Sequence, residues 1–121
     1  MTIILNLRSV SGREAAKRIR QAAQIIKNGG IVVFPTETVY GIGANALDAK
    51  ACKKIYSIKG RASDNPLIVH VSSLEMASRI GEIPKKYIRI LSKVWPAPLT
   101  VIVRAKKQLP KVVTGGLNTV A

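Results

Sequence analysis

Near the N-terminus, apolar and polar positions predict a strand, a helix and a second strand. Residues 3–7 alternate as in a short strand. The tetrapeptide Ser11-Gly12-Arg13-Glu14 has the spacing of a capping box, in which the hydroxyl and the carboxylate each accept from a free N–H at a helix start. Apolar residues then recur at helical spacing until Gly29-Gly30. The apolar run 31–34, ended by Pro35, predicts a strand buried on both faces.

The rest of the chain alternates between segments of the same kinds. Residues 36–46 are rich in Thr and Gly and predict irregular structure. Helical spacing predicts three further helices, over 49–58 with Asp48 as its cap, from Ser72 or Ser73 to about Gly81, and from Pro84 to about Val94. Apolar runs predict strands over 67–71 and 99–104, a turn at 114–116, and the approach to a last strand at 117–121. Strands that alternate with helices indicate an α/β fold.

Length and composition are typical of one globular domain. The chain has 121 residues, of which 47% are hydrophobic. A chain of this size is expected to bury roughly two-thirds of the surface that it exposes when unfolded. No apolar run approaches the ~20 residues that span a bilayer, and the N-terminus lacks the pattern of a signal peptide. We therefore expect one domain over residues 1–121, a cytoplasmic location and no membrane contact.

The net charge of the chain is the feature of its composition that says most about possible partners. Twenty Lys and Arg stand against six Asp and Glu, a net charge of +14. Two interpretations are open: a polyanionic partner such as RNA or nucleotide phosphates, or a solvated basic surface. Cys52 and His70 are alone of their kinds, so neither an intrachain disulfide nor a metal site is expected. So few acids also argue against a hydrolase with paired carboxylates.

The segment that follows the strand at 31–34 is the first candidate for chemistry. Residues 34–43 read Phe-Pro-Thr-Glu-Thr-Val-Tyr-Gly-Ile-Gly. Strand ends in open α/β sheets are where ligands bind, and glycine lets the backbone approach a ligand closely. The alternative is a plain turn in which Thr hydroxyls satisfy backbone groups.

A second candidate, Lys59-Gly60-Arg61, follows the helix at 49–58. Lys offers a point charge, and Arg offers a bidentate fork for phosphate or carboxylate; alternatively, both cations only cover the C-terminal end of the helix. The sequence contains neither the Walker-type motif Gly-x4-Gly-Lys-Ser/Thr nor the Gly-x-Gly-x-x-Gly fingerprint, the two standard glycine motifs that bind nucleotide phosphates. His70, at the end of a predicted strand, either orients a ligand or is a structural residue. No catalytic triad can be assembled, so no covalent nucleophile is expected.

Taken in order, these segments resemble the YrdC-like family. The resemblance runs from about residue 15 to the last residue and rests on four motifs. They are GGIVVFPTETVYGIG at 29–43, KGR at 59–61, NPLIVH at 65–70 and WPAPLT at 95–100. The family's usual Trp-Pro-Gly-Pro is Trp-Pro-Ala-Pro here, a change that we expect to be tolerated.

The resemblance implies a fold and a reaction. The fold would be a twisted mixed sheet with flanking helices around a basic cavity. The activity would be that of an ATP-dependent L-threonylcarbamoyladenylate synthase, which joins L-threonine, bicarbonate and ATP into L-threonylcarbamoyl-AMP and releases pyrophosphate. Mg²⁺ would accompany the ATP, and no covalent intermediate would form on the protein. Downstream threonylcarbamoyl-transfer proteins and tRNA would be the partners.

The resemblance also implies roles for individual residues of this chain. The expected ATP and phosphate ligands are Lys59, Arg61, Thr38 and Tyr40. The expected threonine ligands are Thr36, Arg61 and His70. The residues expected to line the pocket are Pro35, Glu37, Gly41, Asn65 and Pro66.

Family members continue beyond Ala121 into a further strand and a later Ser-x-Asn motif. We therefore expect a partial YrdC-like domain that lacks its C-terminal portion, binds its ligands weakly and makes little or no product alone. Two other hypotheses stay open. One is a basic RNA-binding module without catalysis. The other is a domain of a larger carbamoyl-transfer enzyme, although acylphosphatase-like or zinc-binding segments are absent from this sequence.

Overall fold

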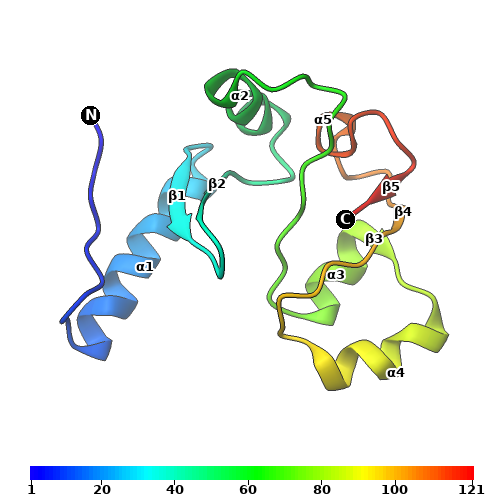
Figure 1. Ribbon diagram of the computed structural model, residues 1–121, viewed down its shortest axis with the longest axis horizontal. Coiled ribbons are helices and arrows are strands. Elements are labelled where there is room, and N and C mark those ends of the chain that lie inside the picture. The colour runs from blue at the N-terminus through cyan, green and yellow to red at the C-terminus, as the bar shows by residue number, and fades with distance from the viewer.

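The computed structural model describes residues 1–121, which form five helices and five short strands (Figure 1). The helices are α1 (Gly12–Lys27), α2 (Ala49–Lys59), α3 (Leu74–Ile80), α4 (Lys85–Val94) and α5 (Lys111–Thr114). The strands are β1 (Val32–Pro35), β2 (Tyr40–Gly43), β3 (Gly81–Glu82), β4 (Val103–Ala105) and β5 (Thr119–Val120). α1, β1 and β2 lie on one side of the molecule and the other elements on the opposite side. The predicted α/β class is confirmed.

Helix α1 begins where the sequence predicts, but only half of the capping box forms. The Ser11 hydroxyl accepts a hydrogen bond from the backbone N–H of Glu14 at 3.2 Å. The Glu14 carboxylate instead receives the Arg18 guanidinium at 3.0 Å. The strand predicted over residues 3–7 is wrong. That segment has no neighbouring strand, and Ile4 is 88% exposed; without a partner, its alternating pattern cannot form a ladder.

Strands β1 and β2 form an antiparallel hairpin in which Phe34 faces Gly41. The prediction that β1 is buried on both faces is wrong, because Phe34 is half-buried while Val33, on the opposite face, is 63% exposed. The prediction of irregular structure over 36–46 is also wrong for β2. Its glycines weaken the strand signal in the sequence, and pairing with β1 overrides that local preference.

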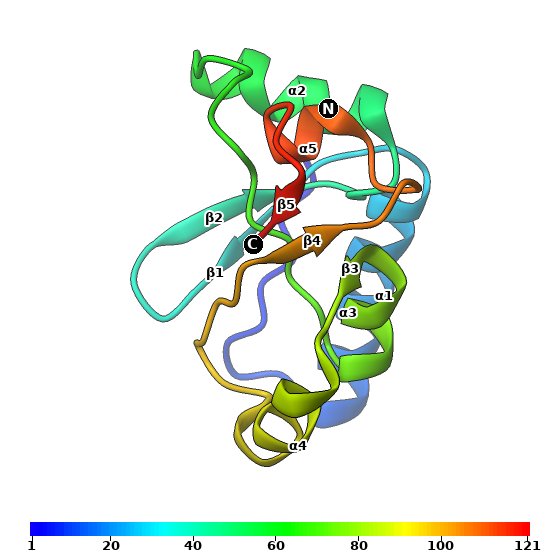
Figure 2. The same ribbon diagram turned by 90° about the vertical axis from the view of Figure 1, so that its right-hand side faces the viewer.

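The core lies where α2, α5 and β5 meet. The Asp48 carboxylate caps α2, as predicted, and accepts from the backbone N–H groups of Lys50 at 2.9 Å and Ala51 at 3.1 Å. Gly60 ends the helix in the left-handed conformation, with φ of +57°. α2 and α5 lie side by side in both views (Figures 1 and 2). The central buried cluster is Cys52, Leu109, Val113 and Val120.

The second sheet has the antiparallel order β3-β4-β5 (Figure 2). The strand predicted over 67–71 is wrong, because this extended segment makes only isolated ladder-like bonds, from Leu67 N to Val113 O at 2.8 Å and from Val69 N to Ala121 O at 2.9 Å. Of the strand predicted over 99–104, only the end forms, in β4. The strands therefore make two small antiparallel sheets rather than the single mixed sheet that the resemblance implies.

Helices α3 and α4 confirm the sequence prediction. The Ser73 hydroxyl caps α3 by accepting from Met76 N at 3.1 Å, and α4 follows directly on Pro84. None of the five helices is long and apolar enough to cross a bilayer.

The molecule is open rather than tightly packed. Its accessible surface is 9115 Å², whereas a compact monomer of 13.1 kDa exposes roughly 6,400 Å². Only 11 of the 121 residues are buried, and α1 contributes none of them. The expectation that the chain buries two-thirds of its surface is therefore wrong, because α1 and the hairpin stand apart from the core instead of covering it.

Candidate functional site

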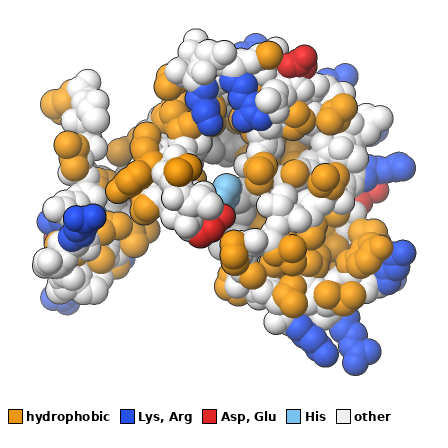
Figure 3. Space-filling model, viewed as in Figure 1, with side chains coloured by type: hydrophobic (Ala, Val, Ile, Leu, Met, Phe, Trp, Pro, Cys, Tyr) orange, Lys and Arg blue, Asp and Glu red, His pale blue; other side chains and the backbone are white.

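One hollow of the molecule is a cleft of about 890 Å³. Its walls come from the hairpin turn at Thr36 and Glu37, the extended segment 68–73, the loop 95–101 and the terminal residue Ala121. Figure 3 shows the single histidine side chain in this hollow, with an acidic group beside it. The cleft thus lies between the two sides of the molecule, and residues far apart in the sequence meet there.

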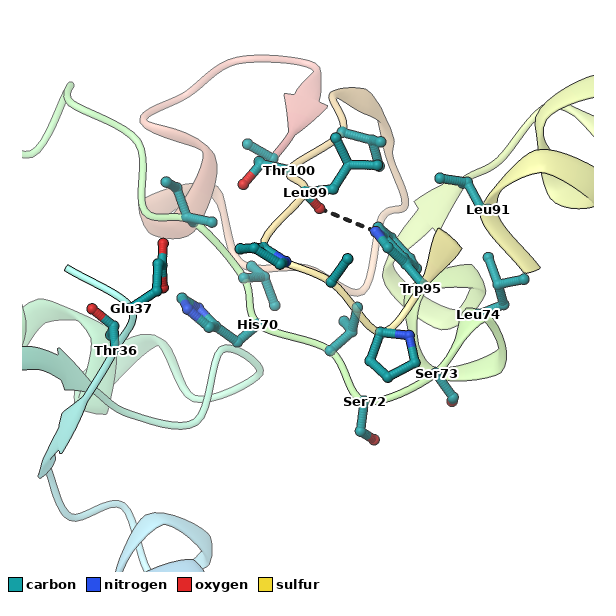
Figure 4. A pocket seen from close by; sticks show the side chains of 18 of the residues that line it. Thr36, Glu37, His70, Ser72, Ser73, Leu74, Leu91, Trp95, Leu99 and Thr100 are labelled. Atoms are coloured by element: carbon teal, nitrogen blue, oxygen red, sulfur yellow. Dashed lines mark hydrogen bonds between the residues drawn. The ribbon is translucent and has the colours of Figure 1, made fainter. Parts of the chain in front are cut away.

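The polar end of the cleft holds three residues that the sequence singled out. Thr36, Glu37 and His70 lie close to one another there, the first two from the hairpin turn and the third from the extended segment (Figure 4). Glu37 and His70 are exposed to solvent. The carboxylate can accept from an ammonium group, and the imidazole can donate or accept, so this end suits a small polar ligand that carries both kinds of group.

Thr36 also holds the turn together. Its hydroxyl donates to Val39 O and accepts from Val39 N at 3.3 Å and Thr38 N at 3.4 Å. The backbone bond from Thr36 N to Val39 O, at 3.2 Å, closes the same turn. The plain-turn interpretation of this segment is therefore correct for Thr36, and the turn places Glu37 at the edge of the cleft.

The other end of the cleft is apolar. Trp95, Leu91, Leu74 and Leu99 line it (Figure 4). The Trp95 indole N–H donates to Leu99 O at 3.1 Å, which ties the two ends of the Trp-Pro-Ala-Pro loop together. A ligand that fills the whole cleft would therefore need a polar part near His70 and an apolar part near Trp95.

The predicted phosphate ligands lie outside this lining. Lys59 is the last residue of α2, and its side chain is exposed. The Arg61 guanidinium donates to the Asn65 side-chain oxygen and to Pro66 O, the latter at 3.4 Å. Figure 3 shows basic side chains projecting from the α2 region above the hollow. The cleft lining itself contains no Lys or Arg.

Arg61, Asn65 and Pro66 thus form a second group. The buried Tyr56 hydroxyl lies 2.9 Å from both Asn65 O and Val112 O, which fixes the loop that carries Asn65 and Pro66 against the core. Arg61 is held by this loop and is pre-oriented, whereas Lys59 is free to turn.

Four further predicted residues belong to the hairpin but do not line the cleft. Tyr40 is 73% exposed, and Gly41 lies opposite Phe34 in the ladder. Pro35 and Thr38 are also exposed. The structure therefore brings Thr36, Glu37 and His70 into one group and leaves these four beside it.

Two buried groups have pKa values above their ordinary range. Burial raises the pKa of the Cys52 thiol, and the nearby Asp48 carboxylate raises it further. Burial also raises the pKa of the Tyr56 phenol, which the Arg61 guanidinium partly offsets. Both groups are therefore neutral near pH 7 and act as packing and hydrogen-bonding groups.

Sequence reasoning missed the apolar wall and the role of Phe34. The Phe34 ring packs edge-to-face against the His70 ring, with 5.8 Å between ring centroids and 79° between planes. The period of β1 puts Phe34 and Val33 on opposite faces, but no sequence signal shows which face meets His70. In the sequence, Trp95 stands out only as part of the WPAPLT motif at 95–100.

Comparison with known proteins supports the grouping of these motifs. Residues 24–121 match the Sua5/YciO/YrdC family model, described as "Telomere recombination". The threonylcarbamoyl-AMP synthase of Pyrococcus abyssi (strain GE5 / Orsay) is 48% identical over 122 residues, which cover 100% of this chain and 35% of the relative. A Bacillus subtilis (strain 168) threonylcarbamoyl-AMP synthase is 47% identical, over 86% of this chain and 31% of the relative.

Solved structures show the same fold. A variant of P. abyssi Sua5 has a TM-score of 0.89 at 47% identity and covers 99% of this chain and 36% of that chain. P. abyssi Sua5 in complex with L-threonine has a TM-score of 0.80 at 48% identity, over 86% of this chain and 31% of that chain. The chain spans about a third of the length of these relatives. Since the family model covers most of the chain and the fold agrees throughout, this chain belongs to the Sua5/YciO/YrdC family.

Proposed function

We propose that this chain provides part of the threonine and ATP site of a threonylcarbamoyl-AMP synthase. The observation that carries the proposal is the 48% identity, along the whole chain, to an enzyme of that name. In the reaction, the amine of L-threonine adds to bicarbonate with loss of water and gives a carbamate. A carbamate oxygen then attacks the α-phosphorus of ATP, and pyrophosphate leaves. Downstream transfer proteins would then move the threonylcarbamoyl group of the product, L-threonylcarbamoyl-AMP, to an adenosine of tRNA, and AMP would leave.

Threonine would occupy the polar end of the cleft. P. abyssi Sua5 binds L-threonine, and in this chain Thr36, Glu37 and His70 form that end. The Glu37 carboxylate suits the ammonium group of an amino acid, since charge-assisted hydrogen bonds are about twice as strong as neutral ones. His70 would donate to the threonine carboxylate or hydroxyl. Arg61, whose guanidinium donates to Asn65, would add a second donor for the carboxylate.

ATP would lie along the rim above the cleft. Lys59 and Arg61 would neutralise its phosphates, and Thr38 and Tyr40 would contact it from the hairpin. The structure has no group of three or more His, Cys, Asp or Glu side chains that could hold a metal ion. Mg²⁺ would therefore enter on the phosphate oxygens of ATP, the mode that this ion prefers over an all-protein cage.

In this scheme the protein acts by placement and by charge. The carbamate must meet the α-phosphorus in line with the leaving pyrophosphate, and holding both reactants in place lowers the entropic part of the barrier. Cations at the rim would stabilise the negative charge that develops on the phosphate oxygens. No side chain needs to form a covalent bond to the substrate.

Calorimetric titration of L-threonine, with and without Mg-ATP, tests the proposal. We expect saturable threonine binding that His70→Ala weakens, and ATP enhancement that Lys59→Ala reduces. Lys53→Ala is the matched control, because Lys53 is also an exposed cation of α2 but lies away from its C-terminal end. If His70→Ala binds threonine as tightly as the wild type, the cleft is not the threonine site and the proposal fails.

A second candidate function, binding of RNA, rests on helix α4. All four of its cations are exposed, and none forms an ion pair with an acid; the residues are Lys85, Lys86, Arg89 and Lys93. Residues four apart on a helix are about 6 Å apart along its axis, so Lys85, Arg89 and Lys93 form a row. Such a row can follow a phosphate backbone.

Binding of tRNA at several salt concentrations tests this candidate. Four phosphate contacts on a flexible strand give a slope of about −3 for log K against log salt. Replacing the four α4 cations by Ala should weaken binding and flatten the slope. The matched control removes four exposed α1 cations that also lack ion pairs: Arg13, Lys17, Arg20 and Lys27. Equal losses from both helices would mean that only overall charge matters and that α4 is no specific surface.

A further inference from the structure

The His70 ring is oriented by packing rather than by hydrogen bonds. Its backbone is fixed, since the preceding Val69 N donates to Ala121 O at 2.9 Å and Leu67 N donates to Val113 O at 2.8 Å. The imidazole itself takes part in no hydrogen bond or ion pair with another residue. The direction in which its nitrogens point therefore depends on what the ring packs against.

The ring that His70 meets is that of Phe34. The centroids are 5.8 Å apart and the planes are inclined by 79°, which lies within the edge-to-face geometry that aromatic pairs prefer. Phe34 comes from β1 on one side of the molecule and His70 from the extended segment on the other.

The Phe34 ring in turn packs against two glycines of β2, Gly41 and Gly43. A Cβ atom on Gly43 would be 2.7 Å from Phe34 Cε1, closer than real Cβ atoms come to other atoms. A Cβ atom on Gly41 would be 3.5 Å from the same ring, an ordinary contact. Gly41 and Gly43 are two residues apart and so share one face of β2. Only the absence of a side chain at position 43 lets the ring sit where it does.

We infer that Phe34 is a positioning residue that fixes the His70 imidazole in the cleft, and that Gly43 is required because it holds Phe34 in place. Neither residue lines the cleft; both act through His70. The consequence for threonine rests on the proposed function, whereas the positioning of the ring does not. A Phe and a Gly on neighbouring strands would thus determine how tightly the polar end of the cleft holds its ligand.

Proton NMR of the imidazole tests the positioning directly, because His70 is the only histidine and gives a single set of ring resonances. Phe34→Leu removes the aromatic ring together with its ring current, so the position of the imidazole is read from the nuclear Overhauser contacts of its ring protons, which should change; Gly43→Ala should change them and shift the resonances without contact to His70, by displacing Phe34. Phe34→Tyr keeps the ring and should restore the wild-type spectrum. Val33→Ala, on the opposite and exposed face of β1, is the control that should change nothing.

A double variant tests whether Gly43→Ala acts on His70 through Phe34 or through a general disturbance of the fold. In the Phe34→Leu background, Gly43→Ala should cause no further shift of the His70 resonances, because the ring that it displaces is gone. Amide spectra report whether each variant is folded. If Phe34→Leu and Gly43→Ala both leave the nuclear Overhauser contacts of the His70 ring unchanged in folded protein, the inference is overturned.

Threonine titration of the same samples separates the inference from the proposed function. We expect threonine to shift the His70 resonances of the wild type, and its Kd to rise about 2- to 10-fold in Phe34→Leu, the range that one aromatic pair accounts for. If threonine leaves His70 unchanged in the wild type while Phe34→Leu shifts the ring, the positioning stands and the proposed function fails. If threonine binds equally well to both proteins although the ring has moved, the functional part of the inference is overturned.

Discussion

The loop that holds Arg61 rests on the backbone of Gly115. This glycine ends α5 in the left-handed conformation, with φ of +59°. A Cβ atom there would lie 2.5 Å from Asp64 O and 3.3 Å from Pro66 Cδ. The contacted atoms flank Asn65, whose side chain accepts from Arg61. A change at Gly115→Ala therefore tests whether this loop is rigid.

The expected cost has two parts. An L-residue in the left-handed region costs about 1–2 kcal/mol. Forcing an extra methyl group against packed atoms costs roughly 1–3 kcal/mol more. Gly60 has nearly the same φ, +57°, but a Cβ atom there would have no neighbouring atom within 4 Å. Gly60→Ala should therefore lose only the first part, about 1–2 kcal/mol, and Gly115→Ala about 2–5 kcal/mol in total.

Urea unfolding followed by circular dichroism measures both variants. The difference between them isolates the contact with the loop, because the backbone cost is shared. Gly116→Ala, with φ of +83° and open space around it, is a second control that should behave like Gly60→Ala. If Gly115→Ala is no less stable than the two controls, the loop moves aside freely, and it cannot be what fixes the Arg61 guanidinium.

Three other predictions concern α2. Asp48→Ala should lower the free energy of unfolding by about 1 kcal/mol, since the carboxylate caps two backbone N–H groups; Asp48→Asn, which keeps an acceptor oxygen, should lose less in the same urea assay. Tyr56→Phe should cost about 1–3 kcal/mol, because it removes the hydroxyl that lies 2.9 Å from two carbonyl oxygens; a neutral result would show that these oxygens find water instead. The raised pKa of Cys52 predicts a pH dependence: the stabilisation is fully present below the thiol's unfolded pKa of about 8.5 and is lost as pH rises through the higher folded value. Cys52→Ala should therefore flatten the fall in stability above about pH 8.5, and an unchanged slope would assign that fall to other groups such as Tyr56.

Local signals in the sequence predicted four of the five helices, and only the short α5 was not predicted. Ser11, Asp48 and Ser73 each carry a side-chain oxygen that can accept from the first free N–H groups of a helix, and each caps a helix in the structure. Glycine at position 60 marks a C-terminal end in the same local way. These interactions lie within a few residues of one another, so the sequence alone contains them.

Whether a segment forms a strand depended on a second segment that pairs with it, and the sequence pattern does not show which segments pair. Residues 3–7 and 67–71 have strand-like patterns, but neither meets a neighbour that can complete a ladder. Residues 40–43 look like a loop because of their glycines, yet they form β2 by pairing with β1. Pairing is a property of two segments, and propensity describes only one.

For the candidate site, too, the sequence indicates residue types, whereas contacts between distant segments come from the tertiary structure. The sequence by itself indicated which residues are candidates for chemistry: His70, the Lys59–Arg61 pair and the Thr36–Glu37 turn stand out by type, and their order matches the family. Only the tertiary structure decided that Thr36, Glu37 and His70 share one cleft, that the Arg61 guanidinium donates to Asn65, and that Phe34 faces His70. The physical reason is that these contacts join segments held in place by a core of four side chains from α2, α5, β5 and the loop before α5, and a contact between distant segments leaves no periodic trace in either of them.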